Sequence, residues 1–162
     1  MMKASKDALA LIKHFEGCRL EAYPDPGSVD GKPWTIGYGH TGRDVVKGLR
    51  WTQTQADAAL AADIVEFERG VNSLVKVKLS QWQFDALVSF SFNCGINSLK
   101  ESTLLRLANG AHYSGAANQF ERWTKNNGKE LLGLKRRRLA EKLLFLTGDI
   151  KLALAEADKI KQ

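Results

Sequence analysis

The prolines of this chain all fall in one short segment. They lie between residues 18 and 51, and they are Pro24, Pro26 and Pro33. Proline interrupts helix interiors and central strands, so the segment predicts short strands and turns, with the best strand at 34–38. From Thr52 onward the hydrophobic spacing becomes helical and stays so. The sequence therefore predicts an α+β fold that is predominantly α-helical.

Helix start and stop signals surround this segment. Residues 5–16 form an amphipathic pattern that begins at a capping serine, Ser5, and stops at Gly17. Two S/T-x-x-Q capping boxes begin later helices; their pairs are Thr52 with Gln55 and Ser80 with Gln83. Further helices are expected at about 102–109, 113–122 and 134–147, followed by a tail at 149–162 that forms a short helix or frays.

This order predicts a single domain over residues 1–162 with three parts. The N-terminal helix and a small β-containing lobe take up about 1–51. A long connecting helix covers about 52–70, and a helical lobe covers about 71–162. A ligand is expected in a cleft between the lobes.

Charge and cysteine content exclude few function classes. The net charge of +6 favours an anionic partner, whether nucleic acid, an acidic membrane surface or an anionic polymer such as bacterial peptidoglycan. No apolar run resembles a secretion signal or a membrane span, so we expect neither. Cys18 and Cys94 lie far apart in the sequence and are expected to be free, buried thiols, with a disulfide or a reactive thiol as the alternatives.

Three side chains near the N-terminus suggest catalytic chemistry. Glu16 is expected as the last residue of the first helix, Asp25 in a turn and Thr35 on a strand. A carboxylate is electrostatically disfavoured at a helix C-terminus, which suggests that Glu16 has a function there. Two carboxyl groups in different surroundings are the minimal equipment for cleaving a glycosidic bond.

Several ordered motifs point to a known family. They are 15–20 (FEGCRL), 22–26 (AYPDP), 34–41 (WTIGYGHT), 86–95 (ALVSFSFNCG), 102–106 (STLLR) and 133–138 (GLKRRR). Together they resemble the bacteriophage-type lysozymes, the muramidase endolysins. The resemblance extends over nearly the whole chain, to about Gly148.

The resemblance implies a lysozyme-like two-lobed fold and hydrolysis of the β-1,4 bond between N-acetylmuramic acid and N-acetylglucosamine in peptidoglycan. It makes Glu16 the general acid, while Asp25 and Thr35 position a water molecule. His40 would support the site, and Phe92 and Asn93 would contact substrate. No metal and no organic cofactor is implied. The expected scheme is inverting, with carboxyl groups about 6.5–9.5 Å apart; a separation near 5 Å would favour a covalent intermediate.

Some assignments have alternatives. The loop 27–33 is longer than in the shortest family members, so Asp30 rivals Asp25; the nine-residue offset from Glu16 favours Asp25. Phe92 fits core packing as well as substrate contact. The run 136–138 (RRR) is expected on a solvated helix face with one inward salt bridge, and not as a nucleic-acid site.

The resemblance also suggests a biological setting. The partner would be bacterial peptidoglycan, with no nucleic acid and no membrane anchor. The protein would stay in the host cytoplasm as a monomer until a holin releases it to the cell wall, and lysis would follow. Competing functions are a zinc amidase, a peptidoglycan-binding module without activity and a basic nucleic-acid-binding domain. The histidines His14, His40 and His112 form no zinc motif, so a structural role is expected for each.

Overall fold

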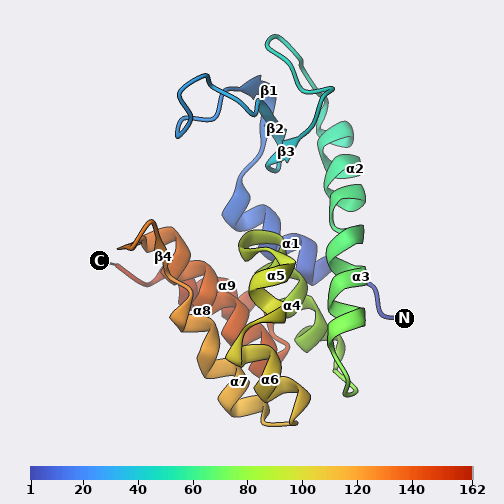
Figure 1. Ribbon diagram of the computed structural model, residues 1–162, viewed down its shortest axis with the longest axis vertical. Coiled ribbons are helices and arrows are strands. Elements are labelled where there is room, and N and C mark those ends of the chain that lie inside the picture. The colour runs from blue at the N-terminus through green and yellow to red at the C-terminus, as the bar shows by residue number, and fades with distance from the viewer. Residues whose placement is uncertain (162) are drawn as a thin grey trace. The chain divides into compact units, whose positions relative to one another are not determined.

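Backbone contacts in the computed structural model, which describes residues 1–161, divide the chain into two units (Figure 1). One unit is Glu16–Val65. The other consists of Met1–Phe15 and Glu66–Gln162. We call them the β-containing unit and the helical unit and describe each by itself.

The β-containing unit has a three-stranded antiparallel sheet in the order β1-β2-β3. The strands are β1 (Arg19–Tyr23), β2 (Thr35–Gly37) and β3 (His40–Thr41). Tyr23 pairs with Thr35, and Thr35 in turn pairs with Thr41. The predicted strand at 34–38 is therefore confirmed as the central strand of this sheet.

Helix α2 (Gln53–Asp63) packs against β2 and β3 in the same unit. Thr52 caps it with the predicted box, because its hydroxyl accepts from the N–H of Gln55 and the Gln55 side chain accepts from the N–H of Thr52. A small hydrophobic cluster fills the unit. Its buried members are Ala22, Ile36 and Val45, and the half-buried side chains around them are Trp34, Leu49 and Trp51.

The helical unit contains the remaining elements. They are α1 (Lys6–Glu16, up to Phe15), α3 (Val65–Leu74, from Glu66), α4 (Gln81–Cys94), α5 (Ile96–Lys100), α6 (Thr103–Asn109), α7 (Tyr113–Gln119), a 3-10 turn (Phe120–Arg122), β4 (Lys125–Asn126), β5 (Lys129–Glu130), α8 (Leu132–Thr147) and α9 (Ile150–Asp158). Helix α8 packs against α4 and α9, and α6 lies beside α7 (Figure 1).

Helix α4 is the centre of the helical unit. Every residue from Phe84 to Ser91 is buried, so the helix has no solvent-facing side over two turns. The predicted Ser80–Gln83 box begins it. Its buried carboxylate, Asp85, accepts hydrogen bonds from the backbone N–H of Ser5, the hydroxyl of Ser5 and the side chain of Gln81, so burial leaves it with partners.

Most predicted helices are confirmed, with shifted ends. Ser5 accepts from the N–H of Asp7 at 3.2 Å and caps the first helix, as expected.

The expected long connecting helix is divided at Ile64 into α2 and α3. The helix expected at 113–122 ends at Gln119 and continues as a 3-10 turn. The tail forms α9. Both cysteines are free, as expected, but they are half-buried and not buried. Helix α5 and the β4–β5 hairpin were not predicted from the sequence.

The prediction of a solvated arginine run was wrong for two of its three members. Arg137 and Arg138 are buried in α8, next to buried Glu141. The carboxylate of Glu141 lies 3.3 Å from Nε of Arg137 and 2.8 Å from Nε of Arg138, although the second contact is not aligned as a hydrogen bond. Spacings of three and four residues place all three groups on one helix face, where they neutralise one another in part.

The arginine groups in this cluster also have uncharged partners. Arg137 donates to the carbonyl of Ser89 at 3.2 Å, and Ser89 donates to Glu141 at 2.6 Å. The Arg138 guanidinium lies 5.1 Å from the ring centre of Phe90. The cluster therefore joins α8 to α4 through charged groups removed from water.

Candidate active site

Glu16 is the last residue of α1, as predicted, and its side chain is half-buried. The helix stops there because Gly17 adopts a left-handed conformation, with φ of 69°. Gly39 also has a positive φ, and a Cβ atom at this position would lie 3.2 Å from Oε1 of Glu16. The Glu16 carboxyl therefore lies close against the backbone of the turn between β2 and β3.

Asp25 lies in the loop after β1 and is half-buried. Its Oδ1 accepts from the N–H of Gly27 at 2.9 Å, which is the side-chain turn typical of aspartate. Its own N–H donates to the carbonyl of Gly31 at 2.8 Å. These two hydrogen bonds hold the carboxyl group at the base of the loop.

Thr35 is the first residue of β2 and is half-buried. It pairs with Tyr23, so Asp25, two residues beyond Tyr23, lies at the same end of the β1–β2 pair as Thr35. Gly39, beside Glu16, follows two residues after the other end of β2. Glu16, Asp25 and Thr35 therefore all belong to the β-containing unit. Strand β2 relates them, because Asp25 and Thr35 lie near its first residue and Glu16 lies near the turn that follows its last residue.

Asp30, the rival of Asp25, lies in the same loop but is exposed. Its Oδ1 accepts from the N–H of Lys32 at 3.0 Å. Both aspartates thus shape the loop. Asp25 differs in being half-buried and in lying only two residues after β1, which keeps it near the end of the strand pair that carries Thr35.

His40 links β3 to α2. Its Nδ1 lies 2.8 Å from Oδ2 of Asp63, and its ring lies 5.2 Å from that of Trp51. Asp63 was not anticipated, because it is 23 residues away in the sequence and only the packing of α2 on the sheet brings it close. The contact ties β3 to α2 within the β-containing unit.

Phe92 and Asn93 lie in the other unit, in the last turn of α4. Phe92 is half-buried and packs edge-to-face on Phe67, with ring centres 5.3 Å apart. Asn93 is exposed, and its Oδ1 accepts from the guanidinium of Arg138 at 2.7 Å. Phe92 thus takes part in packing, and Asn93 is oriented by the buried charge cluster.

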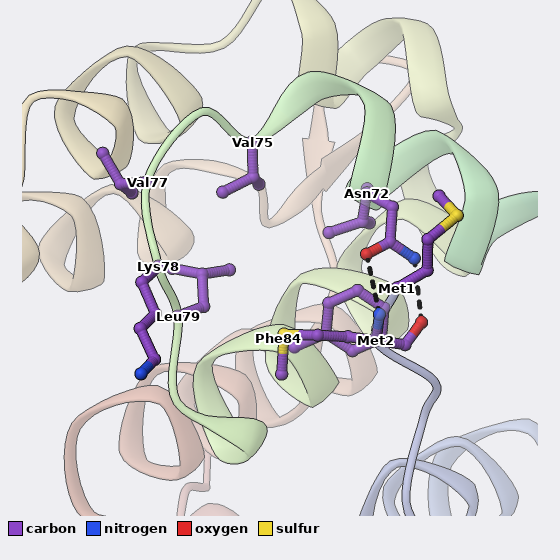
Figure 2. Close-up of a pocket in the computed structure, with 9 residues that line it drawn as sticks. Met1, Met2, Asn72, Val75, Val77, Lys78, Leu79 and Phe84 are labelled. Carbon is purple, nitrogen blue, oxygen red and sulfur yellow. Dashed lines mark hydrogen bonds between the residues drawn. The ribbon is translucent and has the colours of Figure 1, made fainter.

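A cavity of about 470 Å³ lies elsewhere in the helical unit, between the N-terminal residues and α3–α4 (Figure 2). Asn72 holds the chain start beside it, since its side chain accepts from the N–H of Met2 and donates to the carbonyl of Met2. Val75, Leu79 and Phe84 contribute apolar walls. None of the predicted site residues lines this cavity.

The described residues contain no group of three or more His, Cys, Asp or Glu side chains that could hold a metal ion. Within residues 1–161, every helix is too short or too polar to cross a lipid bilayer.

The sequence is similar to a known protein family and to several of its members. Residues 13–141 match the phage lysozyme family. The chain is 44% identical to the endolysin of Bacillus phage B103 over 99% of its own length, but it spans only 60% of that protein. It is also 44% identical to the endolysin of Acyrthosiphon pisum secondary endosymbiont phage 1, of which it covers 98%.

The fold agrees with solved structures of the same kind. The muramidase domain of SpmX from Asticaccaulis excentricus superposes with a TM-score of 0.82 and is 44% identical; the match covers 91% of this chain and 99% of that domain. The predominantly helical lysozyme-like α+β fold and the family resemblance expected from the sequence are therefore confirmed. The chain belongs to the phage lysozyme family.

Proposed function

We propose that this chain is a muramidase that hydrolyses the β-1,4 bond between N-acetylmuramic acid and N-acetylglucosamine in bacterial peptidoglycan. Glu16 acts as the general acid, and Asp25 and Thr35 position the attacking water. The observation that carries the proposal is the placement of Glu16 at a helix end, with its carboxyl against Gly39 in the unit that also holds Asp25 and Thr35.

Two further facts support the proposal. A solved relative that is 44% identical over most of this chain is described as a muramidase domain, and several curated relatives are described as endolysins. The three side chains also offer the right chemistry. A carboxyl group can protonate the leaving sugar oxygen, a second carboxylate can activate water, and a threonine hydroxyl can hold that water.

The local structure suits this division of labour. Asp25 accepts a backbone hydrogen bond from the N–H of Gly27, which fixes the orientation of its carboxyl group toward a water molecule. Thr35 is the first residue of the central strand β2. Its backbone is held between its two pairing partners, Tyr23 on β1 and Thr41 on β3. Oriented groups that need no rearrangement lower the barrier to the reaction.

The test is digestion of purified peptidoglycan by wild type and by Glu16→Gln, with mass spectrometry of the released fragments. We expect new reducing ends at N-acetylmuramic acid from wild type, and a loss of rate of about 10²–10⁴-fold in the variant. Glu21→Gln is the matched control, since it removes an exposed carboxylate five residues away in the same unit, and it should retain full activity.

Other products would point to other reactions. Free peptides without new reducing sugars would indicate an amidase, and anhydro-sugar ends would indicate a lytic transglycosylase. Full activity in Glu16→Gln, folded as judged by circular dichroism, would refute the assignment of the acid. The same assay separates the two aspartates, because Asp25→Asn should lose far more activity than Asp30→Asn.

The stereochemistry belongs to the same proposal. A water positioned by Asp25 and Thr35 attacks the sugar carbon directly, so the configuration at that carbon inverts. Proton NMR of the first anomer formed from a chitin or peptidoglycan oligomer distinguishes inversion from retention. Retention would imply a covalent intermediate and would contradict the role given to Asp25.

The biological role that follows is lysis of a bacterial host at the end of phage growth. The proposal includes accumulation as a monomer in the host cytoplasm and release to the cell wall through a holin. Expression in bacteria with and without a co-expressed holin tests this step. Lysis that is equally fast without the holin would contradict it.

A further inference from the structure

The β-containing unit has a large pocket that the proposed catalytic residues do not line. Its volume is about 900 Å³, and it lies between the β1–β2 loop and the segment that follows β3. The loop contributes Lys32 and Trp34, and the later segment contributes Thr41, Arg43 and Lys47. All of these residues belong to Glu16–Val65, so the pocket lies within one unit.

The pocket is strongly basic. Lys32, Arg43 and Lys47 are exposed, and within residues 1–161 none of their side chains forms an ion pair or a hydrogen bond. The one acidic residue in the lining is Asp30. Three cations without protein partners around one concave surface create a positive potential that attracts anionic groups.

The pocket also adjoins Thr35. Thr41 lines the pocket and is the cross-strand partner of Thr35. Residues directly opposite each other in an antiparallel pair point to the same face, with Cβ atoms about 4.5–5.5 Å apart. A ligand group held in the pocket therefore lies next to the side chain that is proposed to hold the attacking water.

We propose that this pocket binds the stem peptide of peptidoglycan through its carboxylates. The inference rests on the proposed muramidase function and adds a substrate feature to it. The stem peptide hangs from the lactyl group of N-acetylmuramic acid, the sugar on one side of the scissile bond, so it starts close to the reaction centre. Its free carboxylates match Lys32, Arg43 and Lys47.

The rest of the lining fits the same ligand. Trp34 is half-buried and Val46 is exposed, and together they offer apolar surface to the methyl and methylene groups of the peptide. Asp30 can face the free amino group of a diamino acid in the stem. A polymer carrying only phosphodiesters would have no use for an acidic residue, so the mixed lining favours a peptide.

The test compares two substrates and two triple variants of the whole chain. One substrate is solubilised glycan that carries stem peptides, and the other is the same glycan after enzymatic removal of the peptides. The pocket variant is Lys32→Gln with Arg43→Gln and Lys47→Gln. The control variant is Lys100→Gln with Arg106→Gln and Lys151→Gln, which makes the same charge change at exposed helix positions of the other unit.

We expect the pocket variant to raise KM on peptide-bearing glycan about tenfold with little change in kcat. On peptide-free glycan its KM should equal that of wild type. The control variant should have the KM of wild type on both substrates. Circular dichroism and thermal unfolding establish that each variant is folded, which the exposure of all six positions favours.

Three results would overturn the inference. Equal KM values for wild type and the pocket variant on peptide-bearing glycan would leave the pocket with no role in binding this substrate. An equal rise on both substrates would mean that the three cations act on the glycan as a whole. Loss of binding only to walls that carry phosphodiester polymers would assign the pocket to phosphate. Failure of wild type to cleave either glycan would refute the muramidase proposal itself.

Discussion

The two units of this chain differ in how far an ion pair in each is buried from solvent. In the helical unit, Arg137, Arg138 and Glu141 are buried together and form ion pairs away from water. In the β-containing unit, the ion pair between Glu21 and Arg50 lies in solvent, with 57% and 77% of the two side chains exposed. Buried charges are costly to separate, whereas solvated ones are easily exchanged.

The hydrophobic cores differ in the same direction. The helical unit is built around α4, a helix buried on every side over two turns. The β-containing unit has a small cluster around Ile36, and it carries all three proposed catalytic residues and the basic pocket. A stable scaffold and a smaller unit rich in loops fit a common arrangement, in which binding residues lie on loops that a rigid framework positions.

The largest expected effect tests the contrast between the two charge arrangements. Glu141→Gln leaves two buried guanidinium groups without a counter-charge, so we expect the free energy of unfolding to fall by about 3–5 kcal/mol. Glu21→Gln removes one partner of the exposed pair and should change it by about 0–1 kcal/mol. Urea unfolding of both variants at neutral pH measures the difference.

The outcome also decides how the cluster should be understood. Similar small losses in the two variants would mean that water reaches Arg137 and Arg138, contrary to their burial. A variant Glu141→Gln that fails to fold agrees with the upper end of the expected loss. A second measurement, on Ser89→Ala, then removes the hydroxyl that donates to the Glu141 carboxylate and should cost less, about 1.5–3 kcal/mol.

The second prediction concerns the contact between Gly39 and Glu16. Gly39→Ala and Gly48→Ala both place a side chain at a positive φ, 81° and 88°, at a cost of about 1–2 kcal/mol each. Only at position 39 does the new Cβ meet Glu16, 3.2 Å from Oε1, whereas nothing lies within 4 Å at position 48. We therefore expect kcat to fall about 10- to 100-fold for Gly39→Ala alone.

Kinetics on soluble glycan with both variants checks this expectation, and the Gly48→Ala variant controls for backbone strain. Wild-type activity in both variants would mean that the contact between Gly39 and Glu16 does not affect catalysis. Equal loss in both would mean that strain anywhere in the β-containing unit disturbs the site.

The sequence predicted the elements better than the contacts between them. Capping boxes at Thr52 and Ser80 and the stop at Gly17 are local signals, and the structure follows them. The split of the connecting helix at Ile64 carries no such signal, since Ile64 keeps helical dihedrals and still donates to the carbonyl of Leu60. Helix α5 is only five residues long, too short for a periodic pattern to reveal it.

The site shows the same limit. The motifs placed Glu16, Asp25 and Thr35 on a helix end, a loop and a strand, as found. They could not give the partner of His40 or the burial of the arginine run, because each depends on a residue that only tertiary packing brings near. Glu141 was the available signal for the arginines, since a carboxylate at i+3 and i+4 on one helix face can compensate two of them.

The smallest expected effect concerns Cys94 and alkaline pH. Burial raises the pKa of the Cys94 thiol above its usual value, and the neighbouring Arg138 offsets this only in part. The thiol therefore ionises at a lower pH in the unfolded chain than in the folded chain. Between these two pKa values the free energy of unfolding falls as the pH rises. Below the pKa of the unfolded thiol, about 8.5, the stabilising contribution is fully present.

Replacing Cys94 by alanine should therefore make the decline in stability between pH 8 and pH 10 shallower than in wild type. Urea unfolding at several pH values measures the two slopes, and Cys18→Ala controls for the removal of a thiol as such. Identical slopes in wild type and Cys94→Ala would mean that the thiol ionises as readily in the folded chain as in the unfolded one. The helical unit would then admit water at the end of α4, and its contrast with the β-containing unit would be smaller than the burial of Arg138 suggests.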